Sequence, residues 1–548
     1  MTPSFLDRPI TDWTYDRLLR WRAQVTPDRP FLCFEGGSYQ TFAELWDDVS
    51  RLAAGLSRAG VRQGDRVAIF AGNGLIAVHA WLAINLVGAT DAPINPAFRG
   101  QPLVHALNML GATMAIVEDE LLPALRDIEH DLTTLNQVVH FGELEPPEGA
   151  VAGFNRLALA PYGSIAGGEE DWDAPVTTFD QLSSVLMTSG TSGPSKGVMV
   201  PHAQAILIAR NSVEGMRVVD TDIYYVAHPL FHMSPRYCAL TAAMLVGARV
   251  SLDRGFKAEH WLERVRRAQA TVTIGHGPLL EMIYAQPERP DDADNPLTRL
   301  GTSPFPKHIA ASFERRFGLK GIETWGMTEV GIPCWHPYDE PLRVGSCGKP
   351  LSDWFEVMVV DPANDAALPA GEVGELVVRP KYPATLMQGY FGKPEATVEA
   401  WRNLWFHSGD SAYIDHDGWV YFVDRLKDRI RRRAENISSY DIEYAAQQIA
   451  GVVDAAAVGI PSEFAGDDDI KLCVVLSAGS AIGPAELIGP LARALPHHMV
   501  PRYIEIVAEL PRTPTKKVQK AVMRQAGITA ATWDRKQAGI ALRDIING

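Results

Sequence analysis

Cysteine is scarce in this chain. The 548 residues include five cysteines, and no two of them form a C-x-x-C pair. This spacing excludes a disulfide framework and a cysteine-rich zinc site, and it favours a reducing, cytoplasmic setting. The five are Cys33, Cys238, Cys334, Cys347 and Cys473.

Positive charge is also in deficit. The chain has 51 Lys and Arg against 66 Asp and Glu, a formal charge of −15. A protein that coats nucleic acid or an anionic membrane needs a cationic face, so we expect neither as a partner. Any site for a polyanion must therefore be a local basic patch.

A hydrophobic run that could cross a membrane is absent as well. The longest charge-free run, residues 67–90, is interrupted by Asn73, His79, Asn85 and glycines, which suit a strand, a turn and a buried helix. The first residues lack a basic start followed by an apolar core, and the last residues match no lipidation signal. We expect no membrane span and no targeting segment.

Helical and strand patterns alternate in the first half of the chain. Thr41 and Glu44 form a capping box, residues 66–70 are predicted to be a strand, and residues 75–87 are predicted to be a helix. This alternation predicts an α/β fold with helices packed on layered, largely parallel sheets. Residues 142–175 are rich in Gly, Pro and acidic residues, and they are predicted to be a surface connection between two lobes.

The later sequence predicts smaller structural units. Short β-rich runs over residues 354–379 indicate a small sheet or barrel, and the pattern restarts after Asp428. A helix is predicted over residues 442–450, with strands over 452–460 and 470–476. We therefore predict a large multi-lobed N-terminal domain, residues 1–427, and a small C-terminal α+β domain, residues 428–548.

One loop rich in small residues is suited to binding phosphate. Its sequence is Leu186-Met-Thr-Ser-Gly-Thr-Ser-Gly-Pro-Ser-Lys-Gly197. Small residues let backbone amides approach a phosphate chain, and Lys196 supplies a cation. The loop is not a Walker motif, because Ser195 and Gly197 flank the lysine. Taken alone, it is equally compatible with an ordinary flexible turn.

The residue order of this loop resembles the signature loop of the adenylate-forming superfamily, which includes acyl-CoA synthetases, luciferases and the adenylation domains of peptide synthetases. Further segments, in the order usual for that superfamily, extend the resemblance over nearly the whole chain. They are Gly301-Thr-Ser-Pro-Phe305, Trp325-Gly-Met-Thr-Glu329, Met387-Gln-Gly-Tyr-Phe-Gly-Lys-Pro-Glu-Ala-Thr397, Trp405-Phe-His-Ser-Gly-Asp410, Asp424-Arg-Leu-Lys-Asp428 and Pro511-Arg-Thr-Pro-Thr-Lys-Lys517.

The resemblance implies a site for ATP and Mg²⁺. It assigns Mg²⁺ to Glu329, both ribose hydroxyls to Asp410, and the α-phosphate to Lys517. Taken alone, Glu329 is equally a helix cap and Asp410 a turn residue. The residues implied to hold the nucleotide are Thr188, Ser189, Gly190, Thr191, Ser192, Gly193, Lys196, Ser303, Pro304, Trp325, Gly326, Met327, Thr328, Asp410 and Arg425.

The activity implied is that of an ATP-dependent acid–CoA ligase. A carboxylate and ATP are both anions, so attack on the α-phosphorus needs charge neutralisation and alignment more than an enzyme nucleophile. The products are an acyl-adenylate and pyrophosphate. The C-terminal domain then turns about Asp428, withdraws Lys517 and admits the thiol that displaces AMP.

Two alternatives stay open at this point. One is an adenylating enzyme that passes the acyl group to a carrier protein, and the other is a non-catalytic nucleotide-binding homologue. The implied small-molecule partners are ATP, coenzyme A and a carboxylic acid, and a homodimer is a reasonable expectation for such an enzyme.

A basic patch lies beside the predicted hinge of this acidic protein. It suits the phosphates of coenzyme A, although a solvated charge run is an equal alternative. Its sequence also resembles, more loosely, the crotonobetaine/carnitine-CoA-ligase-like branch. The coenzyme A candidates are Arg431, Arg432, Arg433 and Ala434.

The acyl site is less distinct in the sequence. Pro229-Leu-Phe-His-Met-Ser-Pro235 resembles the segment that gates the carboxylate, which makes His232 the candidate gate. Gly275-His-Gly-Pro278 is a candidate pocket wall. His232 is also compatible with a satisfied core histidine. No charged residue in these segments marks a counter-ion for a cationic acid, and the acid itself is not predicted.

Three positions depart from the superfamily pattern. Arg433 and Ala434 replace two hinge-loop glycines, and Lys516 replaces the glycine before Lys517. A Cβ at a hinge glycine restricts the backbone, so these changes bear on the domain rotation. We hypothesise that the enzyme is specialised or slow in one half-reaction.

Overall fold

A computed structural model describes residues 4–142, 152–167, 174–188, 196–426, 430–432, 435–437, 439–462, 468–513, 517–540 and 542. The chain forms two compact units. The first contains residues 1–188, 195–357 and 378–406, and the second contains residues 189–194, 358–377 and 407–548. The predicted domain border between Lys427 and Asp428 lies outside the described residues and stays a prediction.

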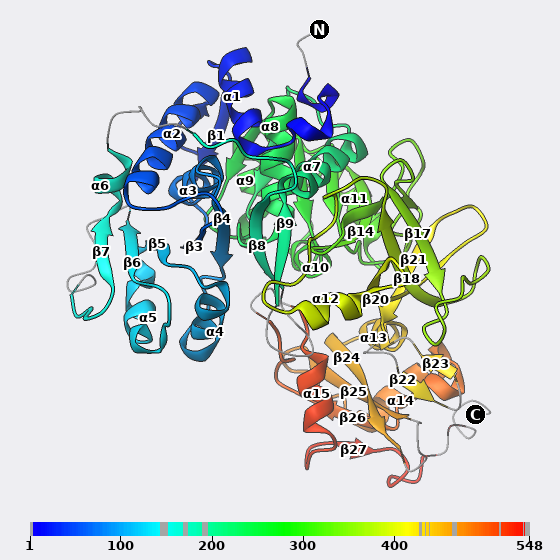
Figure 1. Cartoon of the computed structure of the whole chain (residues 1–548). Coiled ribbons are helices and arrows are strands. Elements are labelled where there is room, and N and C mark those ends of the chain that lie inside the picture. Colours follow the sequence, from blue (N-terminus) through cyan, green and yellow to red (C-terminus); the bar gives the residue numbers. More distant parts are fainter. Residues whose placement is uncertain are drawn as a thin grey trace. The chain divides into compact units, whose positions relative to one another are not determined.

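The first unit contains a seven-stranded sheet in the order β7-β6-β5-β3-β4-β8-β9. Its strands are parallel up to β8, and β9 closes the sheet as an antiparallel strand (Figure 1). The strands are β3 (Arg66–Phe70), β4 (Thr90–Ile94), β5 (Met114–Glu118), β6 (Gln137–Phe141), β7 (Ala158–Pro161), β8 (Leu182–Thr188) and β9 (Lys196–Pro201).

A nine-stranded sheet follows the order β16-β15-β14-β13-β12-β10-β11-β1-β2. Strands β10 to β14 and β1 are parallel, so their carboxyl ends share one edge, where ligands of α/β proteins usually bind. The strands are β1 (Pro30–Phe34), β2 (Gln40–Thr41), β10 (Ile223–Val226), β11 (Arg249–Leu252), β12 (Val272–Gly275), β13 (Arg299–Thr302), β14 (Lys320–Met327), β15 (Gly331–Trp335) and β16 (Lys349–Pro350).

Helices in this part of the chain follow the predicted patterns closely. Thr41 and Glu44 form the predicted capping box of α2, and β3 has the predicted bounds. The predicted helix 75–87 is α3, which ends one residue earlier. The helices are α1 (Tyr15–Val25), α2 (Phe42–Arg58), α3 (Leu75–Leu86), α4 (Gly100–Leu110), α5 (Leu122–Arg126), α6 (Tyr162–Ala166), α7 (His202–Met216), α8 (Ala242–Val246), α9 (Trp261–Ala268), α10 (Gly277–Tyr284), α11 (Ala310–Phe317) and α12 (Pro394–Ala400).

Residues 142–175 were predicted to be a surface connection, and this prediction is wrong for residues 158–166. Residues 158–161 form β7, which pairs with β6, and α6 follows directly. A Cβ on Gly55 of α2 would lie 1.8 Å from the carbonyl oxygen of Ile165. Helix α6 is therefore packed tightly on α2, and a composition rich in Gly and Pro did not reveal this contact.

Five further strands lie between residues 355 and 425, and the first two, β17 and β18, begin within residues 354–379, where a small sheet or barrel was predicted. Their order is β17-β18-β20-β19, and β21 pairs with β20. They are β17 (Phe355–Val360), β18 (Gly374–Pro380), β19 (Trp401–Arg402), β20 (Trp405–Ile414) and β21 (Val420–Arg425).

The second unit ends in a four-stranded sheet, β24-β25-β26-β27, and a two-stranded sheet, β22-β23. The predicted helix 442–450 is α13, which begins and ends three residues earlier. The elements are β22 (Ile430–Arg432), β23 (Glu435–Ile437), α13 (Ser439–Gln447), β24 (Val452–Pro461), β25 (Asp468–Leu476), α14 (Pro484–Ala494), β26 (Tyr503–Ile506), α15 (Lys520–Ala526) and β27 (Trp533–Asp534).

No helix in the described residues is long and apolar enough to cross a membrane. All five cysteine side chains are buried.

Candidate functional site

The predicted phosphate loop connects two paired strands of the seven-stranded sheet. Thr188 at the end of β8 pairs with Lys196 at the start of β9, and its hydroxyl donates to the Lys196 carbonyl oxygen at 3.3 Å. The pairing brings the two ends of the loop together and fixes where the lysine leaves the sheet. The loop residues Ser189, Gly190, Thr191, Ser192 and Gly193 lie outside the described residues.

A second predicted segment, residues 387–391, is attached to β9 through its backbone. The Met199 amide donates to the Gly389 carbonyl at 3.0 Å, and the Phe391 amide donates to the Gly197 carbonyl at 2.8 Å. Gly389 has a φ of +138°, and a Cβ there would lie 2.8 Å from Thr397. The glycine therefore permits the close approach that fixes the next residue, Tyr390.

Tyr390 connects the two charged residues predicted to bind the phosphates and Mg²⁺. Its hydroxyl donates to Glu329 Oε1 at 2.9 Å, and Lys196 Nζ lies 4.4 Å from the centre of its ring. Glu329 is 5% exposed, so its carboxylate is held in a largely water-free position. We call Lys196, Tyr390 and Glu329 the cation–ring–carboxylate array.

The backbone around Glu329 is fixed from two sides. The Met387 amide donates to the Glu329 carbonyl oxygen at 2.9 Å. The side-chain amide of Gln204 on α7 donates to the carbonyls of Thr328 and Glu329 at 2.9 and 3.2 Å. The sequence prediction did not include Tyr390 among the site residues. Its position in the family-like segment Met387-Gln-Gly-Tyr390 could have indicated it.

The resemblance assigns residues 301–305 and 325–329 to the two faces of the adenine, and these segments lie at the ends of neighbouring strands. β13 and β14 are parallel, with Thr302 opposite Glu323, so residues 303–304, which follow β13, and residues 325–328, at the end of β14, lie at the same sheet edge. Trp325 is 5% exposed. A Cβ on Gly326 would lie 2.2 Å from the Gly331 carbonyl oxygen, so only glycine fits this close backbone approach.

A buried carboxyl group lies between these adenine segments. Burial raises the pKa of Glu323 to about 8, while an amide bond from Phe305 and the charge of Lys307 act in the opposite direction. The Glu323 carboxyl is therefore largely protonated at neutral pH. Its bond to Phe305 ties the loop of Ser303 and Pro304 to β14.

The second unit brings together the two residues predicted to hold the ribose. Asp410 on β20 is the register partner of Arg425 on β21. Arg425 Nη1 lies 2.9 Å from Asp410 Oδ1. The Asp410 side chain is 4% exposed and that of Arg425 is 42% exposed, so the pair is accessible from the arginine side only.

The remaining predicted residues of the second unit are only partly described. Lys517 is exposed, and its backbone exchanges hydrogen bonds with Thr513. Asp428, Arg433 and Ala434, together with Lys516 and the side chain of Arg431, lie outside the described residues.

Arg432 is buried, whereas a side chain that binds coenzyme A would have to be exposed. It is 7% exposed, and its guanidinium donates to the carbonyls of His498 and Val500 at 3.3 and 3.1 Å. Its Nη2 also lies 3.4 Å from Asp469 Oδ1. These contacts use its charge inside the second unit, which disfavours Arg432 as a coenzyme A residue.

His276 of one predicted acyl segment lies against His228, the residue directly before the other segment. The rings of His228 and His276 are perpendicular, with centroids 4.7 Å apart. His232 packs on Phe231 with centroids 4.2 Å apart, and a π-helix over Ser234–Thr241 follows it. Local π-helical turns often occur at functional sites.

The donor set around the array fits Mg²⁺ bound together with nucleotide. Mg²⁺ prefers oxygen donors and usually takes one or two carboxylates with substrate phosphates. Glu329 supplies a carboxylate and Thr188 a hydroxyl. Among the described residues there is no group of three or more metal-binding His, Cys, Asp or Glu side chains. Such a sparse set suits an ion that shares its coordination with phosphates.

Comparison with known families agrees with this geometry. Residues 19–391 match the model of the AMP-binding enzyme family, and residues 441–517 match the AMP-binding enzyme C-terminal domain. The chain belongs to the AMP-binding enzyme family. This membership confirms the predicted superfamily and the predicted fold class.

Relatives of this AMP-binding enzyme include the crotonobetaine/carnitine–CoA ligases of Salmonella typhimurium and Salmonella paratyphi C. Each is 30% identical over 510 residues, which cover 91% of this chain and 96% of the relative.

Solved structures share the fold of this chain. ATP-bound MatB from Rhodopseudomonas palustris has a TM-score of 0.83 at 24% identity, covering 94% of this chain and 99% of MatB. The anthranilate–CoA ligase AuaEII, in complex with anthranoyl-AMP, has a TM-score of 0.84 at 23% identity, covering 95% and 98%. At these identities the likeness concerns the fold alone.

Proposed function

We infer that the protein is an ATP-dependent, AMP-forming acid–CoA ligase. It converts a carboxylic acid to an acyl-adenylate with release of pyrophosphate, and coenzyme A then displaces AMP. Family membership over most of the chain and relatives named as CoA ligases support this activity.

The cation–ring–carboxylate array is the observation that carries the proposal. It holds a cation and a buried carboxylate on one aromatic side chain, next to the loop that connects β8 and β9. Lys196 offsets the negative charge of the phosphates, and Glu329 with Thr188 holds Mg²⁺. When bound, Mg²⁺ neutralises further phosphate charge. Tyr390 orients Glu329 through its hydroxyl and Lys196 through its ring.

The other residues hold and orient the two substrates in this proposal. Asp410 accepts hydrogen bonds from the ribose hydroxyls, and Arg425 lies beside it as a second ribose contact. Trp325 and the Ser303–Pro304 loop enclose the adenine. Lys517 approaches the α-phosphate in the first half-reaction and leaves it when the C-terminal domain turns about Asp428.

Tyr390 provides a specific test of the array. A hydrogen bond to a charged group contributes about 1.5–3 kcal/mol, so Tyr390→Phe is expected to slow pyrophosphate release about 10–100-fold. It should also raise the Mg²⁺ concentration needed for half-maximal ATP binding, measured by calorimetry. Tyr382→Phe, at a residue 46% exposed in the same unit, is the matched control. Equal behaviour of the two variants would contradict the role of Tyr390.

A Lys517 variant distinguishes this enzyme from a non-catalytic homologue. Lys517→Ala should abolish acyl-adenylate formation without changing the unfolding midpoint, because the side chain is exposed. Unchanged adenylation would exclude Lys517 from catalysis.

The rates of the two half-reactions and the identity of the acyl-accepting thiol can each be measured. Separate assays of pyrophosphate release and of thioester formation from supplied acyl-adenylate test the hypothesis of a slow half-reaction, and comparing coenzyme A with a phosphopantetheinylated carrier protein identifies the thiol. The homodimer stays a prediction that light scattering can check.

A further inference from the structure

Asn73 lies in the turn between β3 and α3 and contacts the ends of two strands of the nine-stranded sheet. It is 3% exposed. Its side-chain amide donates to the carbonyls of His228 and Asp253, each at 2.9 Å. His228 follows β10 and Asp253 follows β11, and these strands are parallel neighbours. Asn73 therefore joins the two large sheets at the edge where ligands of α/β proteins usually bind.

The same side chain holds the start of the predicted gate segment, residues 229–235. The Leu230 amide donates to Asn73 Oδ1 at 2.8 Å. Both amide hydrogens and the oxygen of Asn73 are thus used, and all three partners are backbone groups. Such a side chain fixes the backbone that it contacts, because a displacement would leave a buried polar group unpaired.

The far end of the gate segment is attached to the same seven-stranded sheet. Arg236, the next residue after the segment, pairs with Asp91 on β4, and both side chains are buried. β3 and β4 are adjacent parallel strands. One sheet therefore holds both ends of the segment, while residues 231–234 between them are only partly buried.

His232 lies one turn beyond the Asn73 contact. Its backbone amide donates to the Pro229 carbonyl oxygen at 3.1 Å, and its ring packs on the neighbouring Phe231. A shift of Leu230 would therefore carry the His232 ring with it.

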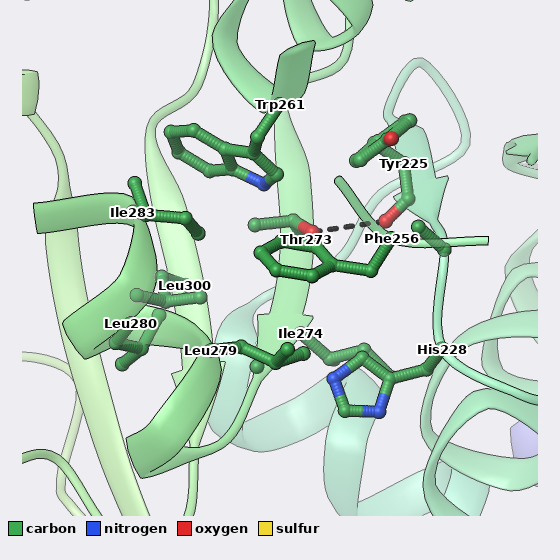
Figure 2. A pocket seen from close by; sticks show the side chains of 12 residues that line it. Tyr225, His228, Phe256, Trp261, Thr273, Ile274, Leu279, Leu280, Ile283 and Leu300 are labelled. Carbon is green, nitrogen blue, oxygen red and sulfur yellow. Dashed lines mark hydrogen bonds between the residues drawn. The ribbon is translucent and has the colours of Figure 1, made fainter. Parts of the chain in front are cut away.

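The side chain of His228 does not replace the Asn73 contact. It borders a small cavity lined mainly by apolar residues of β10, β12, α9 and α10, and Figure 2 shows it at the end of the lining opposite Trp261. The cavity volume is about 10 Å³, room for one water molecule at most. The buried Nε2 of His228 has no hydrogen-bond partner among the described residues. The position of His228 therefore depends on its backbone bond to Asn73 and on its ring contact with His276.

Charged residues hold the Asn73 turn from its other side. The Gly72 amide donates to Glu118 Oε2 at 2.9 Å, and Arg254 pairs with Glu118 Oε1. The backbone amide of Arg254 donates to Glu35 Oε1 at 2.6 Å. The turn is thus fixed on both sides, which makes Asn73 a rigid support for the gate segment.

We propose that Asn73 is a positioning residue for the carboxylic acid, and that it places the predicted gate, His232, through Leu230. The proposal rests on the proposed ligase function and on the predicted gate. Loss of the Asn73 side chain should weaken the use of the acid and leave the use of ATP unchanged, because the segments that hold the nucleotide in the proposed function are separate ones.

Asn295 provides a matched control. It donates to the carbonyls of Asp292 and Phe317 at 2.7 and 2.9 Å. It also accepts a hydrogen bond from the Leu297 amide at 2.9 Å, so it makes the same three kinds of bond as Asn73. Asn295 precedes β13 and so lies at the opposite edge of the nine-stranded sheet.

The test compares Asn73→Ala with Asn295→Ala in ATP–pyrophosphate exchange. The probe is the acid that the wild type uses best among butanoate, octanoate, benzoate and cinnamate. Since a misplacement of about 1 Å can cost about 100-fold, we expect Asn73→Ala to raise the KM for the acid about 10–100-fold. The KM for ATP should change less than about twofold, and Asn295→Ala should change neither KM. An unchanged KM for the acid in Asn73→Ala would overturn the proposal.

A double-mutant cycle tests whether Asn73 acts through His232. If it does, Asn73→Ala should add less than about a twofold loss of kcat/KM for the acid in the His232→Ala background. A full additional loss would show that Asn73 acts by another route, and it would overturn the proposal.

Arg254→Gln keeps the proposal testable if Asn73→Ala does not fold. The Arg254 side chain is 41% exposed, so its replacement loosens the same turn without leaving a buried group unpaired. We expect the KM for the acid to rise about two- to fivefold. If Asn73→Ala does not fold, an unchanged KM for the acid in Arg254→Gln overturns the proposal.

Amide hydrogen exchange separates this proposal from the ligase function. Peptides that cover residues 228–236 should exchange faster in Asn73→Ala than in the wild type or in Asn295→Ala. Faster exchange in a protein whose wild type shows no pyrophosphate exchange supports the anchor and overturns the function. Pyrophosphate exchange with an unchanged KM for the acid keeps the function and overturns the role of Asn73.

Discussion

Two aspartate–arginine pairs in this protein have similar chemistry but different surroundings. In the first unit, Arg236 Nη2 lies 2.6 Å from Asp91 Oδ2, and their side chains are 2% and 0% exposed. In the second unit, Arg425 Nη1 lies 2.9 Å from Asp410 Oδ1, and their side chains are 42% and 4% exposed. One pair is sealed, and the other is accessible on its arginine side.

The sealed pair is built into the core. Asp91 on β4 also accepts hydrogen bonds from Ser184 at 2.6 Å and Asn85 at 3.3 Å. The Arg236 guanidinium lies 4.3 Å from the ring centre of Trp81. Arg236 belongs to the π-helix that follows His232, so the pair anchors the predicted gate segment to the seven-stranded sheet.

The two pairs differ in whether a ligand could take the place of one partner. Partners that are both buried cannot exchange one another for a ligand without leaving an uncompensated charge. An aspartate whose arginine partner is exposed can accept hydroxyl groups from a ligand at little cost. We expect mutations to affect folding at the first pair and nucleotide use at the second.

The largest effect is expected from Arg236→Met. The substitution leaves the buried Asp91 carboxyl without its counter-ion, which should cost about 3–5 kcal/mol of unfolding free energy. Urea unfolding measures the loss. Adding Asp91→Leu removes the unpaired carboxyl and should recover most of the loss. A loss below about 1 kcal/mol would show that the pair does not anchor the core.

Asp410→Asn should weaken the use of ATP and leave the stability of the fold unchanged. The unfolding midpoint should stay close to that of the wild type, while kcat/KM for ATP falls about 10–100-fold, because a hydrogen bond to a charged group contributes about 1.5–3 kcal/mol. The discrimination between ATP and 2′-deoxy-ATP should shrink as well. Unchanged discrimination would contradict the ribose assignment.

Glu323 extends the comparison to a buried carboxyl group that burial keeps protonated. Its folded pKa of about 8 lies above the usual value of 4.5. Between these values the folded protein keeps a proton that the unfolded chain releases, so stability from this group falls as the pH rises from about 4.5 to about 8. Glu323→Gln should flatten this dependence in urea unfolding at pH 5.5, 7 and 8.5. If the unfolding free energy of the variant falls equally steeply with pH, groups other than Glu323 cause the dependence.

The smallest effect is expected at an exposed pair. Arg217 and Asp339 form an ion pair with side chains 53% and 74% exposed. Solvent screening limits such pairs to about 0–1 kcal/mol, so Asp339→Asn should change neither the unfolding free energy beyond that range nor kcat/KM for ATP. If Asp339→Asn lowers the unfolding free energy as much as Arg236→Met does, burial does not explain why the ion pairs differ in their contribution to stability.

Much of the architecture was predictable from local sequence. The capping box at Thr41, strand β3 and helix α3 follow hydrophobic spacing and capping rules that act within a few residues. The predicted class of enzyme is supported by the family match. Strand β7 was missed because its four residues gain their stability from pairing with β6, which the local pattern does not contain.

Site residues that lie in contiguous sequence motifs were predictable. Contacts between segments far apart in the sequence were not. Thr188, Lys196 and Glu329 come from the sequence, and the structure places the last two on either side of Tyr390. The cavity beside His228 depends on strands and helices spread over residues 225–300.

The sequence by itself determined the enzyme family and the α/β class, because these depend on short motifs and local periodicity, and it predicted the residues of a nucleotide site. Only the tertiary structure decided which ion pair is sealed and which is accessible, that Arg432 is used inside its own unit, and that His228 borders an apolar cavity. Burial and hydrogen-bond satisfaction are properties of neighbours brought together by folding, so two identical pairs of residues can differ in role.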